Sequence, residues 1–269
     1  MSETDTMLQT EALSKQFGNI HAVEDVDFSV RKGEIMALVG DNGAGKSTLI
    51  KALCGIHKPT SGTIYIRGEP VEFDDYNDAR ERGIETVYQD LALAENQTVA
   101  ANVFLGHEPV KGGRLGRWLG LVDEEQMIKE ARGSLDKVQI PVDPRAKVKN
   151  LSGGQQQAVA IARALQSDPD ILILDEPTSA LSIEGARNVL RVIDGLRDQG
   201  LTIILISHNI RHVLGLADRL SVLAQGRLMG VRDTDEVSRN EVIALMMGAE
   251  DEEEFEDFEL SQSSEGASA

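Results

Sequence analysis

The chain has 269 residues, a formal net charge of -18, 41% apolar residues and one cysteine, Cys54. This apolar content is enough for a large hydrophobic core, and a single cysteine excludes a disulfide framework and a cysteine metal cluster. Nucleic acid is not an expected partner of so acidic a chain, because binding to phosphate backbones needs clustered lysine and arginine.

The first third of the chain predicts strands that lead into a glycine-rich loop. Residues 21–30 alternate partly between apolar and polar side chains, which predicts a half-buried strand. Residues 34–39 predict a buried strand, residues 48–54 a helix that ends at Gly55, and residues 63–66 another strand after a turn. The N-terminus is acidic where a signal peptide is basic, and no apolar run approaches the ~18 residues of a membrane-spanning helix. We therefore expect a cytosolic protein.

Between the buried strand and the helix lies a complete match to the phosphate-binding pattern GxxxxGK[ST]. Glycines let backbone N–H groups surround a β-phosphate, and the helix that follows directs its positive end toward it. We expect Lys46 to reach the β- and γ-phosphates, Ser47 to bind Mg²⁺ through its hydroxyl, and Thr48 to contact the α-phosphate. The residues expected to bind nucleotide here are Gly40, Asp41, Asn42, Gly43, Ala44, Gly45, Lys46, Ser47 and Thr48.

The middle of the chain, from about residue 90 to residue 165, has a helical character. Residues 94–106 and 124–138 predict helices, and a basic, glycine-rich loop over 111–117 separates them. Residues 151–155 spell LSGGQ, which alone is a polar, glycine-bearing turn that could open any helix.

The last third alternates strands and helices. Residues 171–174, 202–207 and 220–223 predict strands, and residues 183–199 and 210–217 predict helices, which implies a parallel sheet covered on both faces. Asp175 and Glu176 follow the first of these strands, at the edge where α/β sheets bind ligands. We expect Asp175 to hold Mg²⁺ through water and Glu176 to polarise an attacking water.

The order of these motifs resembles an ABC transporter nucleotide-binding subunit over about residues 8–248. The resemblance implies an α/β fold of the ABC-type P-loop ATPase, with a parallel-sheet core, an N-terminal antiparallel β subdomain and an inserted helical subdomain at about 90–165. One nucleotide-binding domain would span residues 1–248. Residues 249–269 are acidic and then serine-rich, and we expect them to be a disordered tail. The body is acidic as well, which a salt-rich cytoplasm would favour.

The same resemblance implies roles for particular residues. Gln89 would contact Mg²⁺ and sense a permease, His208 would hold the γ-phosphate, and Phe17 would stack on adenine, although an ordinary structural role stays open for Gln89 and Phe17. Ser152 and Gly154 would clasp the γ-phosphate held by a second copy. The implied catalytic residues are Glu176, His208, Lys46 and Gln89. The residues implied to bind the metal ion are Ser47, Gln89 and Asp175. The LSGGQ residues implied to bind nucleotide are Ser152, Gly153, Gly154 and Gln155.

Three local features narrow the resemblance. Residues 87–94 and 102–108 resemble the ribose/xylose/fructose-type monosaccharide importers, and Ser182 stands where the wider family often has aspartate. This resemblance implies an ATPase that works as a homodimer at the cytoplasmic face of the cell membrane, beneath permease subunits fed by an extracytoplasmic solute-binding protein. The alternatives are the ATPase of an exporter, a soluble assembly ATPase, and a regulatory module that closes on ATP without turnover. Intact Lys46, Asp175, Glu176 and His208 argue against the regulatory module.

Overall fold

A computed structural model of the chain describes residues 6–112 and 120–248. These residues fall into two units, one formed by the described residues before Gly83 and after Leu201, the other by those from Gly83 to Leu201. Within the described ranges, no helix is long and apolar enough to cross a bilayer. The expected tail over 249–269 and most of the basic loop over 111–117 lie outside the described residues.

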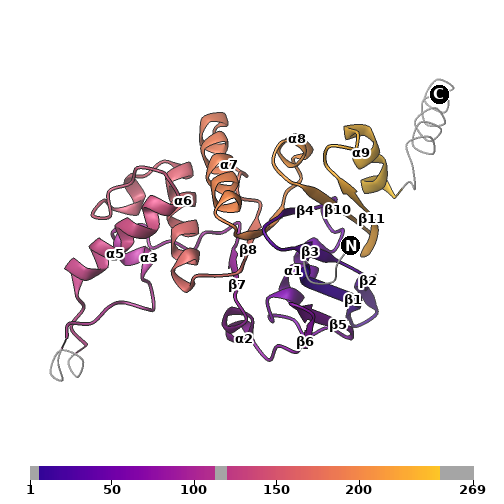
Figure 1. Cartoon of the computed structure of the whole chain (residues 1–269), viewed down its shortest axis with the longest axis horizontal. Helices are drawn as coiled ribbons and strands as arrows, with labels where there is room; N and C mark the ends of the chain where they lie inside the picture. Colours follow the sequence, from indigo (N-terminus) through magenta and orange to yellow (C-terminus); the bar gives the residue numbers. More distant parts are fainter. Residues whose placement is uncertain (1–5, 113–119, 249–269) are drawn as a thin grey trace. The chain divides into compact units, whose positions relative to one another are not determined.

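The first unit contains an antiparallel sheet with the strand order β2-β1-β5-β6, to which β3 adds by pairing with β1 (Figure 1). This sheet is the antiparallel part that the family resemblance implies. The strands are β1 (Thr6–Phe17), β2 (Ile20–Val26), β3 (Ser29–Arg31), β5 (Ser61–Ile66) and β6 (Glu69–Val71). The sequence pattern does not predict β1, the longest of them.

The prediction of one strand over residues 21–30 is wrong, because residues 27 and 28 lie outside both β2 and β3. The buried hydroxyl of Thr10 lies at this break: it donates to the carbonyl oxygen of Val26 (2.8 Å) and accepts from the backbone N–H of Phe28 (2.9 Å). Thr10 lies in β1, far from both residues along the chain, so alternation within 21–30 cannot reveal this contact.

A second sheet of the first unit has the order β11-β10-β4-β9. Its strands are β4 (Ile35–Val39), β9 (Thr202–Ile206), β10 (Arg219–Ala224) and β11 (Arg227–Asp233). β4 runs parallel to β9 and β10, and β11 pairs antiparallel with β10 at the edge. Every residue of β4 and β9 is buried, as expected for central strands of a parallel sheet.

The described residues of this unit form the helices α1 (Lys46–Leu53), α2 (Tyr76–Glu81), α8 (Ile210–Leu214) and α9 (Arg239–Met247). α8 ends at Leu214, before the predicted end at residue 217. α9 packs against β10 (Figure 1), and neither it nor its neighbour β11 is predicted by the sequence pattern.

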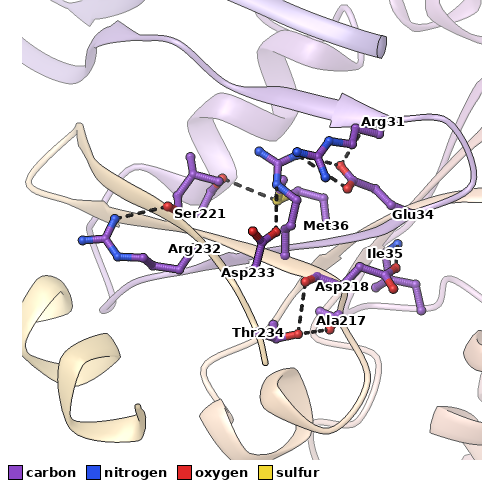
Figure 2. Close-up of polar contacts among 12 residues, drawn as sticks. Arg31, Glu34, Ile35, Met36, Ala217, Asp218, Ser221, Arg232, Asp233 and Thr234 are labelled. Atoms are coloured by element: carbon purple, nitrogen blue, oxygen red, sulfur yellow. Dashed lines mark hydrogen bonds and ion pairs between the residues drawn. The ribbon is translucent and has the colours of Figure 1, made fainter. Parts of the chain in front are cut away.

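A buried ion pair joins the start of β10 to the residue before β4. The side chains of Arg219 and Glu34 are only 11% and 8% exposed, and their Nη1 and Oε1 atoms lie 3.2 Å apart. Glu34 also accepts from the backbone N–H of Arg31 at 2.7 Å (Figure 2). Arg219 approaches Asp233 of β11 at 3.8 Å. Because both charges have several partners, the pair helps to fix the register of β4, β10 and β11.

We predict that Glu34→Ala lowers the free energy of unfolding by about 3 kcal/mol, because it leaves the Arg219 guanidinium buried without its main partner. Urea unfolding followed by circular dichroism measures this loss. Arg227→Ala is the matched control: it removes an ion pair with Glu24 whose side chains are 65% and 36% exposed, and it should cost at most about 1 kcal/mol. Equal losses in the two variants would contradict the prediction.

The second unit contains a parallel pair of strands, β7 (Ile84–Val87) and β8 (Ile171–Asp175). Its helices are α3 (Val99–Val103), α5 (Glu124–Lys137), α6 (Gly153–Ala164) and α7 (Ile183–Asp198). α6 packs against α3, α5 and α7 (Figure 1). Met127, Ala131 and Leu135 form the buried face of α5 at helical spacing. The predictions for α5 and α7 are confirmed to within a residue or two.

The predicted helix over 94–106 is wrong in length, because only Val99–Val103 is helical. The side chain of Asn102, fully buried, accepts from the backbone N–H of Ala94 at 2.7 Å and donates to the carbonyl oxygens of Ala94 and Thr98. These contacts hold residues 94–98 in a loop, and the Thr98 hydroxyl then caps the short helix by accepting from Ala101.

Candidate functional site

The glycine-rich loop over residues 40–45 leaves β4 and turns into the first turn of α1. Its inner side is fixed by backbone contacts: the N–H of Gly226 donates to the carbonyl oxygen of Ala44 at 2.9 Å. A Cβ at Gly45, where φ is 104°, would lie 2.4 Å from the carbonyl oxygen of Ala22 in β2, so only glycine fits there. The outer residues Asp41, Asn42 and Gly43 are exposed. The loop is therefore packed closely against the protein on its inner side and exposed to solvent on its outer side.

The side chains that follow the loop add to the groups expected to bind an anion. The Nζ atom of Lys46 donates to the carbonyl oxygens of Gly40 at 2.7 Å and Asp41 at 3.0 Å, so the ammonium group lies across the loop. Ser47 and Thr48 stand in the first turn of α1, which no side chain caps at Gly45. The N–H of Thr48 donates to the carbonyl oxygen of Gly45 at 3.0 Å, and the N–H groups before it belong to those that a helix leaves without an internal partner. Backbone N–H groups, an ammonium group and hydroxyls together are the donor set that fits a polyphosphate and its metal ion.

His208 lies at the same edge of the sheet as this loop. β4 and β9 are parallel, and Leu38 pairs with Ile206, so both strands end at one edge. His208 is exposed and follows β9 at a bend, where the N–H of Asn209 donates to the Ser207 hydroxyl at 3.1 Å. Phe17, the expected adenine contact, ends β1 and is 43% exposed.

In the second unit, three expected residues gather at the carboxyl end of β7 and β8. Val87 pairs with Leu174, so the two parallel strands end together. Gln89 is exposed just beyond β7, Asp175 ends β8, and Glu176 follows it, the last two being partly buried. In the described residues there is no group of three or more His, Cys, Asp or Glu that could hold a metal ion.

The backbone of Glu176 is held in an unusual conformation. Its φ of 51° lies in the left-handed region, which is uncommon for a residue with a side chain and is concentrated at functional sites. Ser179 stabilises this turn, because its N–H and its hydroxyl both donate to the carbonyl oxygen of Glu176, at 3.0 and 2.9 Å. Sequence reasoning does not identify Ser179, because serine in a turn is too common to be a signal.

The LSGGQ segment begins α6. Ser152 and Gln155 form a capping box: the N–H of Gln155 donates to the Ser152 hydroxyl at 3.4 Å, and the N–H of Ser152 donates to Oε1 of Gln155 at 3.0 Å. Ser152 and Gly153 are exposed. Gly154 is buried, and a Cβ there would lie 3.2 Å from Cα of Gly185 in α7. The first residues of the motif are therefore exposed at the start of α6, while Gly154 packs closely against α7.

Ser182, the departure from the family pattern, caps α7. Its hydroxyl accepts from the N–H of Gly185 at 3.1 Å. Serine and aspartate are both good N-cap residues, so this replacement keeps the local structure.

Comparison with known proteins gives a consistent result. The family model described as ABC transporter matches residues 23–179, more than half of the chain. The chain is 41% identical to the fructose import ATP-binding protein FrcA of Rhizobium meliloti, over 92% of this chain and 96% of that protein. It is 41% identical to the xylose/arabinose import ATP-binding protein XylG of Sulfolobus acidocaldarius, over 89% and 93% of the two chains. It spans only 47% of the xylose import ATP-binding protein XylG of Geobacillus kaustophilus, also at 41% identity.

Solved structures agree with the fold. One ATP-binding cassette of an ABC transporter, in its ADP conformation, superposes with a TM-score of 0.77 at 26% identity, covering 93% of this chain and 98% of that one. A dimeric bacterial ABC transporter cassette gives a TM-score of 0.69 at 27% identity and covers 85% and 99%.

Proposed function

The chain belongs to the ABC transporter family, and we propose that it is the ATP-hydrolysing subunit that energises a membrane importer of a monosaccharide. The observation that carries this proposal is the 41% identity along 96% of a fructose import ATP-binding protein. This chain also contains the phosphate loop, the LSGGQ segment and the Asp175–Glu176 pair. The residues expected to be needed for ATP turnover are therefore present beside the overall sequence identity.

In this proposal, ATP binds at the glycine-rich loop of the first unit. Lys46 and the backbone N–H groups of residues 40–47 hold the β- and γ-phosphates, Thr48 contacts the α-phosphate, and Phe17 stacks on adenine. A Mg²⁺ ion held by Ser47, Asp175 and Gln89 would neutralise charge on the phosphates. All of these groups are compatible with an acidic protein, because the positive potential is local to the loop and the start of α1.

Hydrolysis requires a positioned water and stabilised charge. Glu176 accepts a hydrogen bond from the attacking water and orients it, while His208 and Lys46 donate to oxygens of the γ-phosphate. Ser152, Gly153, Gly154 and Gln155 of a second copy close the site from the other side, with the start of α6 directed at the γ-phosphate. Two copies then form a homodimer with two equivalent sites, an arrangement in keeping with the dimeric cassette of similar fold.

The partner in transport would be a pair of permease subunits, with this chain bound to them at the cytoplasmic face of the membrane. An extracytoplasmic solute-binding protein would deliver the sugar and contact this chain only indirectly. The relatives at about 41% identity are named for fructose, xylose and arabinose, so pentoses and ketohexoses are the first substrates to test.

The test is affinity purification of the tagged chain from solubilised membranes, followed by reconstitution with the co-purified permease in proteoliposomes. We expect ATP-dependent uptake of one radiolabelled monosaccharide toward the side that holds this chain. Movement in the opposite direction would identify an exporter instead. Recovery of soluble partners alone would favour an assembly ATPase and contradict the transport proposal.

A further inference from the structure

The tip of the β1–β2 hairpin is tied to the turn that follows α1. Lys15 donates from Nζ to the carbonyl oxygen of Lys58 at 2.8 Å, and the N–H of Gln16 donates to the hydroxyl of Thr60 at 3.0 Å. The N–H of Thr60 in turn donates to a carbonyl oxygen of β1 at 2.8 Å. Three hydrogen bonds therefore fix the strand that ends at Phe17.

The same turn is anchored to the end of α1. The N–H groups of Ile56 and His57 both donate to the carbonyl oxygen of Lys51, at 2.9 and 3.0 Å. α1 begins at Lys46, in the phosphate loop. His57 is thus held at one end of a helix whose other end binds phosphate, and the hairpin tip is held against the same turn.

Two polar side chains fix the orientation of the Phe17 ring. The imidazole of His57 meets it edge-on, with centroids 5.2 Å apart and planes at 76°. The ammonium group of Lys15 lies over the ring, 5.1 Å from its centroid. Phe17 nevertheless remains 43% exposed. The ring is therefore held at the surface, with its edge region against the imidazole and one face under a cation.

We infer that Lys15 and His57 are positioning residues that hold the Phe17 ring so that its free face stacks on the nucleobase, and that Lys15 biases this platform toward purines. The inference rests on the proposed function, because it takes Phe17 as the base contact. A cation over one face draws negative charge from the π-system, so the opposite face becomes less negative. That face stacks best on a large, electron-rich base, which a purine provides and a pyrimidine provides less well.

The experiment measures the affinity of the full chain for ATP, for CTP and for inorganic tripolyphosphate, each with Mg²⁺, by isothermal titration calorimetry. Phe17→Ala should weaken ATP binding about 5- to 100-fold, the range of one base stacked on an aromatic ring. Lys15→Met and His57→Ala should each weaken it about 3- to 10-fold. All three variants should bind tripolyphosphate as the wild type does, and Lys15→Met should also reduce the preference for ATP over CTP.

Conservative variants and a control complete the design. Lys15→Arg keeps the cation and His57→Phe keeps the edge-on contact, so both should retain ATP affinity. Lys32→Met, at an exposed lysine, should change nothing. If the wild type binds ATP but Lys15→Met and His57→Ala bind it equally well, the inference is overturned and the proposed function stands. Equal losses for ATP and tripolyphosphate would also overturn it, since they indicate damage to the phosphate site. A wild type that binds no ATP would overturn both.

Discussion

Glu176→Gln is expected to lower ATP turnover about 10²- to 10⁴-fold, the range for loss of a general base, while ATP affinity stays close to that of the wild type. The amide has nearly the shape of the carboxylate, so the turn with φ of 51° at this residue can persist. It lacks the negative charge that polarises water. Because closure of two copies precedes hydrolysis in our proposal, the variant should accumulate as an ATP-bound dimer.

Phosphate release measures the turnover, and size-exclusion chromatography with light scattering, with and without ATP, measures the dimer. Glu184→Gln is the matched control, because Glu184 is an exposed glutamate in the first turn of α7. The control should hydrolyse ATP and change its oligomeric state as the wild type does. A Glu176→Gln protein that turns over at the wild-type rate would remove Glu176 from the catalytic role.

Lys46→Ala should weaken ATP binding about 10²- to 10⁴-fold, since it removes charge-assisted contacts worth about 1.5–3 kcal/mol each to two phosphates. In the structure the ammonium group already lies over the loop, bonded to the carbonyl oxygens of Gly40 and Asp41. It therefore needs little rearrangement to reach a phosphate. Turnover at any practical ATP concentration should fall with the affinity.

Calorimetric titration with ATP tests this prediction. Lys51→Ala provides the control, because Lys51 is exposed in the last turn of the same helix. Its backbone carbonyl oxygen accepts hydrogen bonds from Ile56 and His57, and the substitution leaves that oxygen in place. Thermal unfolding without nucleotide separates a lost ligand contact from a damaged fold. Unchanged affinity in a folded Lys46→Ala protein would show that the loop does not bind phosphate through this side chain.

The motifs expected to carry the chemistry can be recognised in the sequence because their signals are local. The phosphate loop needs glycines and Lys46 at fixed spacing between a strand and a helix, and β4 and α1 provide that context. The apolar run before Asp175 marks a buried strand, and β8 is one. The helices α5 and α7 were predictable for a similar reason, since their apolar residues recur within a few positions along the chain.

What the sequence alone determined about this protein was therefore its fold class, its family and the expected places of its nucleotide-binding residues. The tertiary structure alone decided how those residues are supported: the Thr10 hydroxyl at the break between β2 and β3, the buried Asn102 that shortens α3, and the ring of Phe17 between Lys15 and His57. The ion pair of Glu34 with Arg219 joins residues 185 positions apart. Such contacts form only when the folded chain brings distant residues together, so a pattern of neighbouring residues cannot predict them.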